Sequence, residues 1–260
     1  MIFIGGMPRS GKTLMQGIMC NDKKAIQSTT ECTYLMLLIE AYQKGKYMWD
    51  RHTYQYFTDR NEYFSFNKQI IDGYFSHLSK MIDVSGKEII QKHPCFVSVV
   101  PDLTELYPDS KFIVMKRDIR DAVASNMKIK RDERYSLKYF VDMYINIFRP
   151  FTKWYKNVNV DNILFIQFEE LLTDTDRVMS ELREFTGLSL DFDPLVTEWD
   201  YCRTKEYTTE LDGKPIDSSN IGNYKDLLAQ EEIETLEKYK DNIQQSFPFE
   251  IFWSDSNEDT

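Results

Sequence analysis

Apolar and polar residues follow one another in blocks along the chain, and the blocks predict strands separated by helices. Short runs typical of strands occur at 2–5, 88–92, 111–116 and 162–168. Helical spacing of apolar positions occurs at 11–21, 31–44, 67–83, 118–128, 136–156, 174–186 and 230–242. Strands connected by helices imply βαβ units and a parallel sheet. We therefore expect an α/β fold with a central parallel sheet flanked by helices.

The remaining stretches interrupt this pattern. Residues 46–66 are rich in aromatic side chains, and residues 203–222 are polar with Gly213, Pro215 and Gly222, which is typical of a flexible loop. Neither an internal repeat nor a low-complexity tract is visible. At 260 residues the chain is expected to form a single domain over 1–254, followed by a disordered acidic tail at 255–260.

The first predicted strand runs directly into a glycine-bounded loop at 6–13. A strand, a loop and a helix in this order direct backbone N–H groups and the positive end of the helix at an anion. The loop fits the pattern G-x-x-x-x-G-K-[ST] of nucleoside-triphosphate P-loops, and an ordinary strand-to-helix turn is the alternative. We predict a phosphate-binding loop whose contacts are Arg9, Ser10, Gly11, Lys12, Thr13 and Leu14.

Charge and composition exclude several classes of function. The net charge of −10 argues against a protein that binds duplex nucleic acid or an anionic membrane surface. No stretch is long and apolar enough for a membrane span, and Gly5, Gly6 and Pro8 interrupt the apolar start before it could form a signal peptide. We expect a cytoplasmic protein, with an anchor upstream of this chain as the alternative. The four cysteines lack the paired spacing of a zinc site.

A second candidate anion-binding segment follows the strand at 111–116. Arg117 ends this strand, and Ser125 lies eight residues later, close to two helical turns away. The segment R-D-x-R-D-x-x-x-S resembles the 3′-phosphate-binding segment of sulfotransferases that use 3′-phosphoadenosine 5′-phosphosulfate (PAPS). Residues 8–13 similarly resemble the 5′-phosphosulfate loop of that family. The resemblance implies that Arg117 and Ser125 bind the 3′-phosphate of PAPS.

Two later segments extend the resemblance to roughly residues 2–228. The run 163–172 resembles the family's strand ending in Y-E-D-L, whose aromatic ring stacks on adenine, so Phe168 is expected to take this role. The run 221–225 resembles the late G-x-W-K element near the 3′-phosphate, which makes Lys225 a candidate contact. The motifs are closest to the tyrosylprotein and carbohydrate branch, and they imply a P-loop-type three-layer fold.

Sulfuryl transfer needs a base for the acceptor hydroxyl and a cation for the leaving oxygen. Lys92 matches the catalytic lysine of the family. Glu31 follows the first predicted helix where the matching branch carries G-E-E-T, and is the expected base. His93 is the alternative base, because cytosolic members carry K-x-H-x-P, although adjacent residues of a strand face opposite ways. Arg9, also a candidate catalytic residue, and Lys12 complete the set of cations.

The resemblance implies an enzyme that moves the sulfuryl group of PAPS to a hydroxyl acceptor and releases PAP without a metal ion. The acceptor stays open among a phenol, a tyrosine, a sugar and a lipid alcohol, and residues 47–66 and 203–222 are expected to shape its pocket. The main alternative is a P-loop kinase or NTPase, which needs an acidic strand end to hold Mg²⁺. The strand at 111–116 ends instead in Lys116 and Arg117. A nucleotide-binding protein without catalysis is the third possibility.

Overall fold

Four parallel strands form one sheet at the centre of the molecule. The computed structural model describes residues 1–26, 29–129, 135–190 and 218–253. The strands are β1 (Ile2–Gly6), β2 (Ile90–Lys92), β3 (Lys111–Lys116) and β4 (Ile163–Gln167), in the spatial order β2-β1-β3-β4. The register pairs Ile4 with Lys92, Gly6 with Met115 and Lys116 with Gln167. The expected parallel sheet is confirmed.

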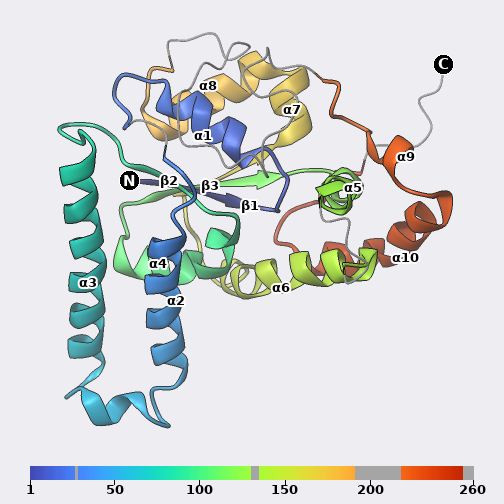
Figure 1. Cartoon of the computed structure of the whole chain (residues 1–260). Coiled ribbons are helices and arrows are strands. Elements are labelled where there is room, and N and C mark those ends of the chain that lie inside the picture. The colour runs from blue at the N-terminus through green and yellow to red at the C-terminus, as the bar shows by residue number, and fades with distance from the viewer. Residues whose placement is uncertain (27–28, 130–134, 191–217, 254–260) are drawn as a thin grey trace.

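Helices cover both faces of the sheet, so the fold has three layers (Figure 1). One face is covered by α1 (Lys12–Cys20), α7 (Phe168–Thr173) and α8 (Thr175–Thr186). The other face is covered by α2 (Thr33–Tyr47), α4 (Val100–Leu106), α6 (Leu137–Tyr155) and α10 (Gln230–Ser246). This arrangement confirms the three-layer α/β fold predicted from the sequence.

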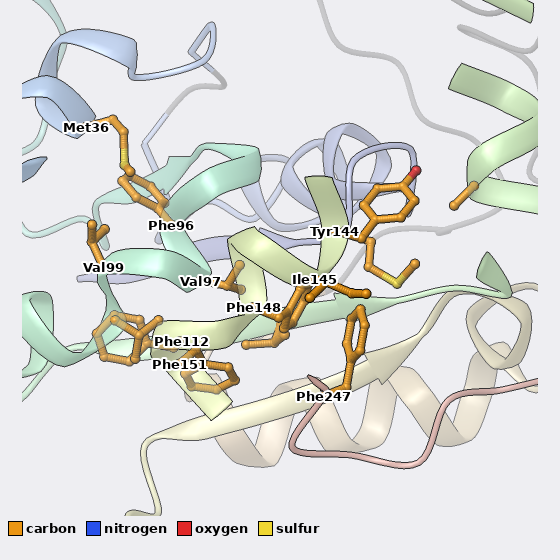
Figure 2. Close-up of a cluster of buried hydrophobic side chains, with 14 of the residues drawn as sticks. Met36, Phe96, Val97, Val99, Phe112, Tyr144, Ile145, Phe148, Phe151 and Phe247 are labelled. Atoms are coloured by element: carbon orange, nitrogen blue, oxygen red, sulfur yellow. The ribbon is translucent and has the colours of Figure 1, made fainter. Parts of the chain in front are cut away.

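Alternate side chains of each strand enter two separate cores, as the two-residue repeat of a strand requires. On β1, Ile2 and Ile4 pack toward α1, whereas Phe3 packs toward the opposite layer. There Phe3 stacks on Phe112 with ring centroids 5.6 Å apart. Figure 2 shows this second core, where Phe148 of α6 meets Phe247 at 4.4 Å between ring centroids. The abundant aromatic residues are therefore used largely to fill one side of the sheet.

Several helices differ from the expected boundaries. α3 (Arg60–Met81) starts at 60 rather than 67, because the Asp59 carboxylate accepts hydrogen bonds from the backbone N–H groups of Asn61 and Glu62. The 3₁₀ helices η1 (Thr53–Tyr56) and η2 (Pro94–Val99) and the short helix α4 were not predicted. The other helices are α5 (Ile119–Ile129) and α9 (Tyr224–Leu227).

Within the described ranges, no helix has the length and hydrophobicity needed to cross a membrane. The expected acidic tail at 255–260 and the part of the expected loop at 203–217 lie outside the described residues.

Candidate active site

The carboxyl ends of all four strands meet at one edge of the sheet, and each end leads into a predicted site residue. β1 leads into the loop at 7–11, and β2 ends at Lys92. Arg117 directly follows β3, and Phe168 directly follows β4. In parallel α/β sheets ligands bind beyond this edge. The topology therefore gathers segments that are distant in the sequence into one candidate site.

The loop between β1 and α1 is held in shape by its own polar groups. The hydroxyl of Ser10 donates to the carbonyl oxygen of Met7 at 2.6 Å, and Lys12 Nζ donates to the same oxygen. Lys12 Nζ also lies 3.4 Å from the Ser10 hydroxyl oxygen. Both side chains are buried, so the loop is preorganised with its cation turned inward.

Phe168 joins the loop to the segment that follows β3. Gly11 has a φ of 81°, which favours glycine, and a Cβ at this position would collide with the ring of Phe168. The guanidinium carbon of Arg117 lies 4.5 Å from the centroid of the same ring, within the range of a cation–π contact. Three of the predicted ligand-binding segments therefore meet around one aromatic side chain.

Arg9 links the two predicted phosphate-binding segments. Its Nε donates to the hydroxyl oxygen of Ser125 at 2.9 Å, and its carbonyl oxygen accepts from Arg117 Nη1 at 2.8 Å. Arg117 Nη2 donates to the carbonyl oxygen of Asn220 at 2.7 Å. The described part of the chain offers no hydrogen-bond partner to the buried Nε of Arg117. Arg117 and Ser125, predicted to share a phosphate, thus both contact Arg9.

Asp121 holds the late segment 220–225 against α5. Its carboxylate accepts from the backbone N–H of Gly222 at 2.8 Å and of Tyr224 at 2.9 Å. Burial raises the pKa of Asp121, while the charge of Arg117 and these two N–H groups act in the opposite direction. Lys225 itself lies exposed on α9. Sequence reasoning missed that Asp121 anchors the segment 220–225, and its only signal was its place as the second Asp of R-D-x-R-D.

The acidic residues nearest the ends of β3 and β4 are bound to other groups of the chain. Asp118 forms a buried ion pair with Arg120 at 2.7 Å, and its backbone N–H donates to Glu169 at 2.9 Å. Burial raises the pKa of Glu169. Across the described ranges there is no cluster of three or more His, Cys, Asp or Glu side chains that could hold a metal ion.

Lys92 and Glu31 form an ion pair beside the loop. Lys92 Nζ lies 3.0 Å from Glu31 Oε1, and the two side chains are 4% and 48% exposed. The backbone N–H and the thiol of Cys32 both donate to the carbonyl oxygen of Lys92, each at 3.2 Å. These bonds tie the start of α2 to the end of β2. The pair therefore offers a buried ammonium and a carboxylate that reaches solvent.

His93 is placed close to these charges but is held by the backbone. Its Nδ1 accepts from the backbone N–H of Cys95 at 3.1 Å, which caps η2. The backbone N–H of His93 donates to the carbonyl oxygen of Ile4 at 3.1 Å. Burial lowers the pKa of His93, and Lys92 lowers it further, whereas Glu31 raises it. The ring is therefore neutral near pH 7.

The other predicted residues lie at the margin of the site. Thr13 and Leu14 belong to the first turn of α1, where Thr13 is exposed and Leu14 packs against the core on that face.

The connection at 48–59 lies at the far end of α2 from Glu31, about 22 Å away for a helix of 15 residues (Figure 1). The connection is part of the stretch 47–66 that was expected to shape the acceptor pocket, and it lies away from the other predicted site residues.

Comparison with known proteins identifies the family of the chain. A sequence model of the Sulfotransferase family matches residues 2–193. The chain belongs to the sulfotransferase family. Apart from Lys225, the predicted site residues of this chain all lie within the matched range.

Two curated relatives come from nematodes. Protein-tyrosine sulfotransferase A of Caenorhabditis elegans is 25% identical over 245 residues, which is 88% of this chain and 58% of the relative. A putative protein-tyrosine sulfotransferase of Caenorhabditis briggsae is 28% identical over 134 residues, which is 50% of this chain and 44% of the relative. The chain thus spans about half the length of these relatives.

Solved structures of sulfotransferase domains share the fold of this chain. The sulfotransferase domain from the curacin biosynthetic pathway superposes with a TM-score of 0.62 at 16% identity, and covers 96% of this chain and 98% of the domain. The sulfotransferase domain of the Synechococcus PCC 7002 olefin synthase superposes with a TM-score of 0.58 at 18% identity, and the match covers 92% of this chain and 94% of that domain. At sequence identities of 18% and 16%, the similarity to these structures shows a shared fold alone.

Proposed function

We propose that this sulfotransferase moves the sulfuryl group of PAPS to a hydroxyl acceptor and releases PAP. The observation that supports this most is the meeting of the loop, Arg117 and Ser125 around Arg9 and Phe168. Lys12 and Lys92 add two buried basic side chains to Arg9 and Arg117 at the same edge of a chain with a net charge of −10. A ligand with several negative charges would complement this local excess of cations.

In this proposal the loop residues Arg9 to Leu14 bind the 5′-phosphosulfate, and Arg117 and Ser125 bind the 3′-phosphate. The adenine ring stacks on Phe168, and Lys225 contributes charge from α9. Within the described ranges the buried Nε of Arg117 has no hydrogen-bond partner, which gives Arg117 a donor for an incoming phosphate oxygen. Arg9 would exchange its contact with Ser125 for contacts with the ligand.

The proposed reaction uses the ion pair beside the loop. The acceptor oxygen attacks sulfur, the bond from sulfur to the bridging oxygen breaks, and the electron pair of that bond stays on the 5′-phosphate of PAP. Lys92 stabilises the charge on this leaving oxygen, and the half-exposed Glu31 takes the proton of the acceptor hydroxyl. In neutral His93 the Nδ1 accepts a hydrogen bond, so the ring proton is on Nε2. This tautomer has no free acceptor nitrogen, which favours Glu31 as the base.

The acceptor is proposed to be a hydroxyl group, and a tyrosine phenol is the first candidate because two curated relatives are named protein-tyrosine sulfotransferases. A half-exposed base suits an acceptor that approaches from solvent, such as a side chain of another protein. Phenols, sugars and lipid alcohols carry the same reacting group and are the comparison substrates.

A P-loop kinase or NTPase is the alternative that the loop sequence allows. Such an enzyme needs a carboxylate near a strand end for Mg²⁺. The two candidates here are bound to other groups, since Asp118 pairs with Arg120 and Glu169 accepts from a backbone N–H. These contacts support the sulfotransferase proposal over the NTPase.

A thermal-shift experiment tests the proposal. PAP with a metal chelator is compared with ATP and Mg²⁺, each at a series of concentrations. A ligand at a hundred times its Kd stabilises the folded state by about 2.7 kcal/mol. We expect a rise in Tm with PAP and none with ATP and Mg²⁺. The opposite result would support the NTPase.

A further inference from the structure

Lys12 has an unusual environment for a lysine. It is the first residue of α1 and is 6% exposed. Its ammonium is directed back into the loop, where its hydrogen-bond acceptors are the carbonyl oxygen of Met7 and the hydroxyl oxygen of Ser10. Both acceptors are uncharged, and a buried ammonium is costly without a charged partner.

The charged groups around Lys12 leave an excess of positive charge. Lys92 and Arg9 both act on Lys12 as cations, and the carboxylate of Glu31 acts against them. Glu31 is already paired with Lys92 at 3.0 Å, so two buried lysines share one half-exposed carboxylate. Among the residues that the structure describes, Cys95 and the neutral His93 are further titratable groups near Lys12.

Burial and the repulsion from Lys92 together lower the pKa of Lys12 to about 7. Near neutral pH a large fraction of the free enzyme then holds Lys12 as an uncharged amine. An anion in the loop would reverse this balance, because a nearby negative charge favours the ammonium form. The same event would therefore change the protonation of Lys12.

We propose that Lys12 takes up a proton from solvent when PAP or PAPS binds in the loop, so that donor binding is coupled to the charging of this side chain. This inference rests on the proposed function. The amine gains one proton from the buffer and becomes an ammonium that pairs with the bound anion, and no covalent bond of the ligand changes. The uncharged state lets the empty enzyme bury two lysines whose charges would repel each other, and the charged state forms when the anion binds.

The coupling predicts a defined pH dependence of PAP affinity. Above the pKa of Lys12 in the free enzyme, each binding event takes up about one proton, so the Kd of PAP rises about tenfold per pH unit. The slope ends where Lys12 titrates in the complex. The phosphates of PAP, with second pKa values of about 6, are already ionised above about pH 7.5 and add little to the slope.

Isothermal titration calorimetry with PAP tests this coupling at constant ionic strength between about pH 7.5 and about pH 9. Titrations near pH 8 in two buffers of different ionisation enthalpy count the protons. The variants are Lys12→Arg, which is always charged, and Lys12→Met, which is never charged. Lys23→Met, an exposed lysine outside the site, is the matched control.

We expect the wild type and Lys23→Met to take up about one proton and to lose affinity about tenfold per pH unit. Lys12→Arg should bind PAP with an affinity that stays flat over this range, and Lys12→Met should bind weakly and equally flat. A flat wild-type profile, or an equal slope in Lys12→Arg, would overturn the inference. PAP binding without proton uptake overturns this inference alone, whereas the absence of PAP binding at every pH overturns the proposed function as well.

Discussion

Asp121 is the residue on which the placement of the late segment depends most directly. Its buried carboxylate is the acceptor for two backbone N–H groups, those of Gly222 and Tyr224. The Asp121→Ala change removes both acceptor oxygens. Tyr224 is 1% exposed, so its N–H stays buried and unpaired, while the half-buried Gly222 can recover part of its bond from water. An unpaired buried donor costs about 1–3 kcal/mol, so we expect a loss of about 2–4 kcal/mol in the free energy of unfolding.

The Asp121→Asn change separates hydrogen bonding from charge. The amide keeps one acceptor oxygen and removes a carboxylate whose raised pKa reflects the cost of its burial. We therefore expect less than half of the loss seen with alanine. Both variants should also weaken PAP binding, because the segment that Asp121 holds includes Asn220, the partner of Arg117.

Thermal denaturation followed by circular dichroism measures these changes. For a chain of this size 1 kcal/mol shifts Tm by about 2 °C, so Asp121→Ala should lower Tm by about 4–8 °C. The exposed Asp226 on the adjacent helix α9 provides the control Asp226→Ala, which should leave Tm unchanged. A Tm for Asp121→Ala within about 1 °C of the wild type would refute the reasoning, since the buried N–H of Tyr224 cannot lose its acceptor at no cost.

Three further predictions concern the site itself. Arg117→Ala should reduce the preference for PAP over 5′-AMP by about 10- to 100-fold in calorimetry, because a charge-assisted contact contributes about 1.5–3 kcal/mol. An unchanged ratio of the two Kd values would remove Arg117 from the 3′-phosphate site. Glu31→Gln should keep PAP affinity but slow transfer about 10²- to 10⁴-fold, while His93→Ala stays active; the reverse pattern would make His93 the base. Gly11→Ala should lower both Tm and PAP affinity, because the new methyl group would collide with Phe168 and a φ of 81° is strained for alanine. An unchanged Tm and affinity would contradict the close approach of the Phe168 ring to the loop.

Local signals explain what the sequence could predict. The apolar run of β3 and the glycine-bounded loop after β1 each lie within a short stretch, so strand, loop and helix are visible before folding. The same holds for the helix α6, whose start is marked by Ser136, which accepts from the N–H of Tyr139. Parallel pairing then follows from the helical connections, and it brings the strand ends together.

Long-range contacts explain what the sequence could not predict. The hydrogen bond from Arg9 to Ser125 joins residues 116 positions apart, and no local pattern reveals that Arg9 of the loop contacts the second anion-binding segment. The early start of α3 depends on the cap at Asp59, which follows a stretch without helical spacing. The helix α4 at 100–106 is only two turns long, too short for apolar periodicity to reveal.

The central claim is that Lys92 and its neighbours transfer the sulfuryl group of PAPS to a hydroxyl. The most direct test incubates the protein with PAPS and a metal chelator, together with a tyrosyl peptide, a simple phenol, a sugar or a lipid alcohol, and measures both PAP and the sulfated acceptor. We predict equal amounts of the two products for at least one acceptor, the same rate in Lys23→Met, and a rate at least about 100-fold lower in Lys92→Ala. Binding of PAP without transfer to any of these hydroxyls, or an undiminished rate in Lys92→Ala, would contradict the account.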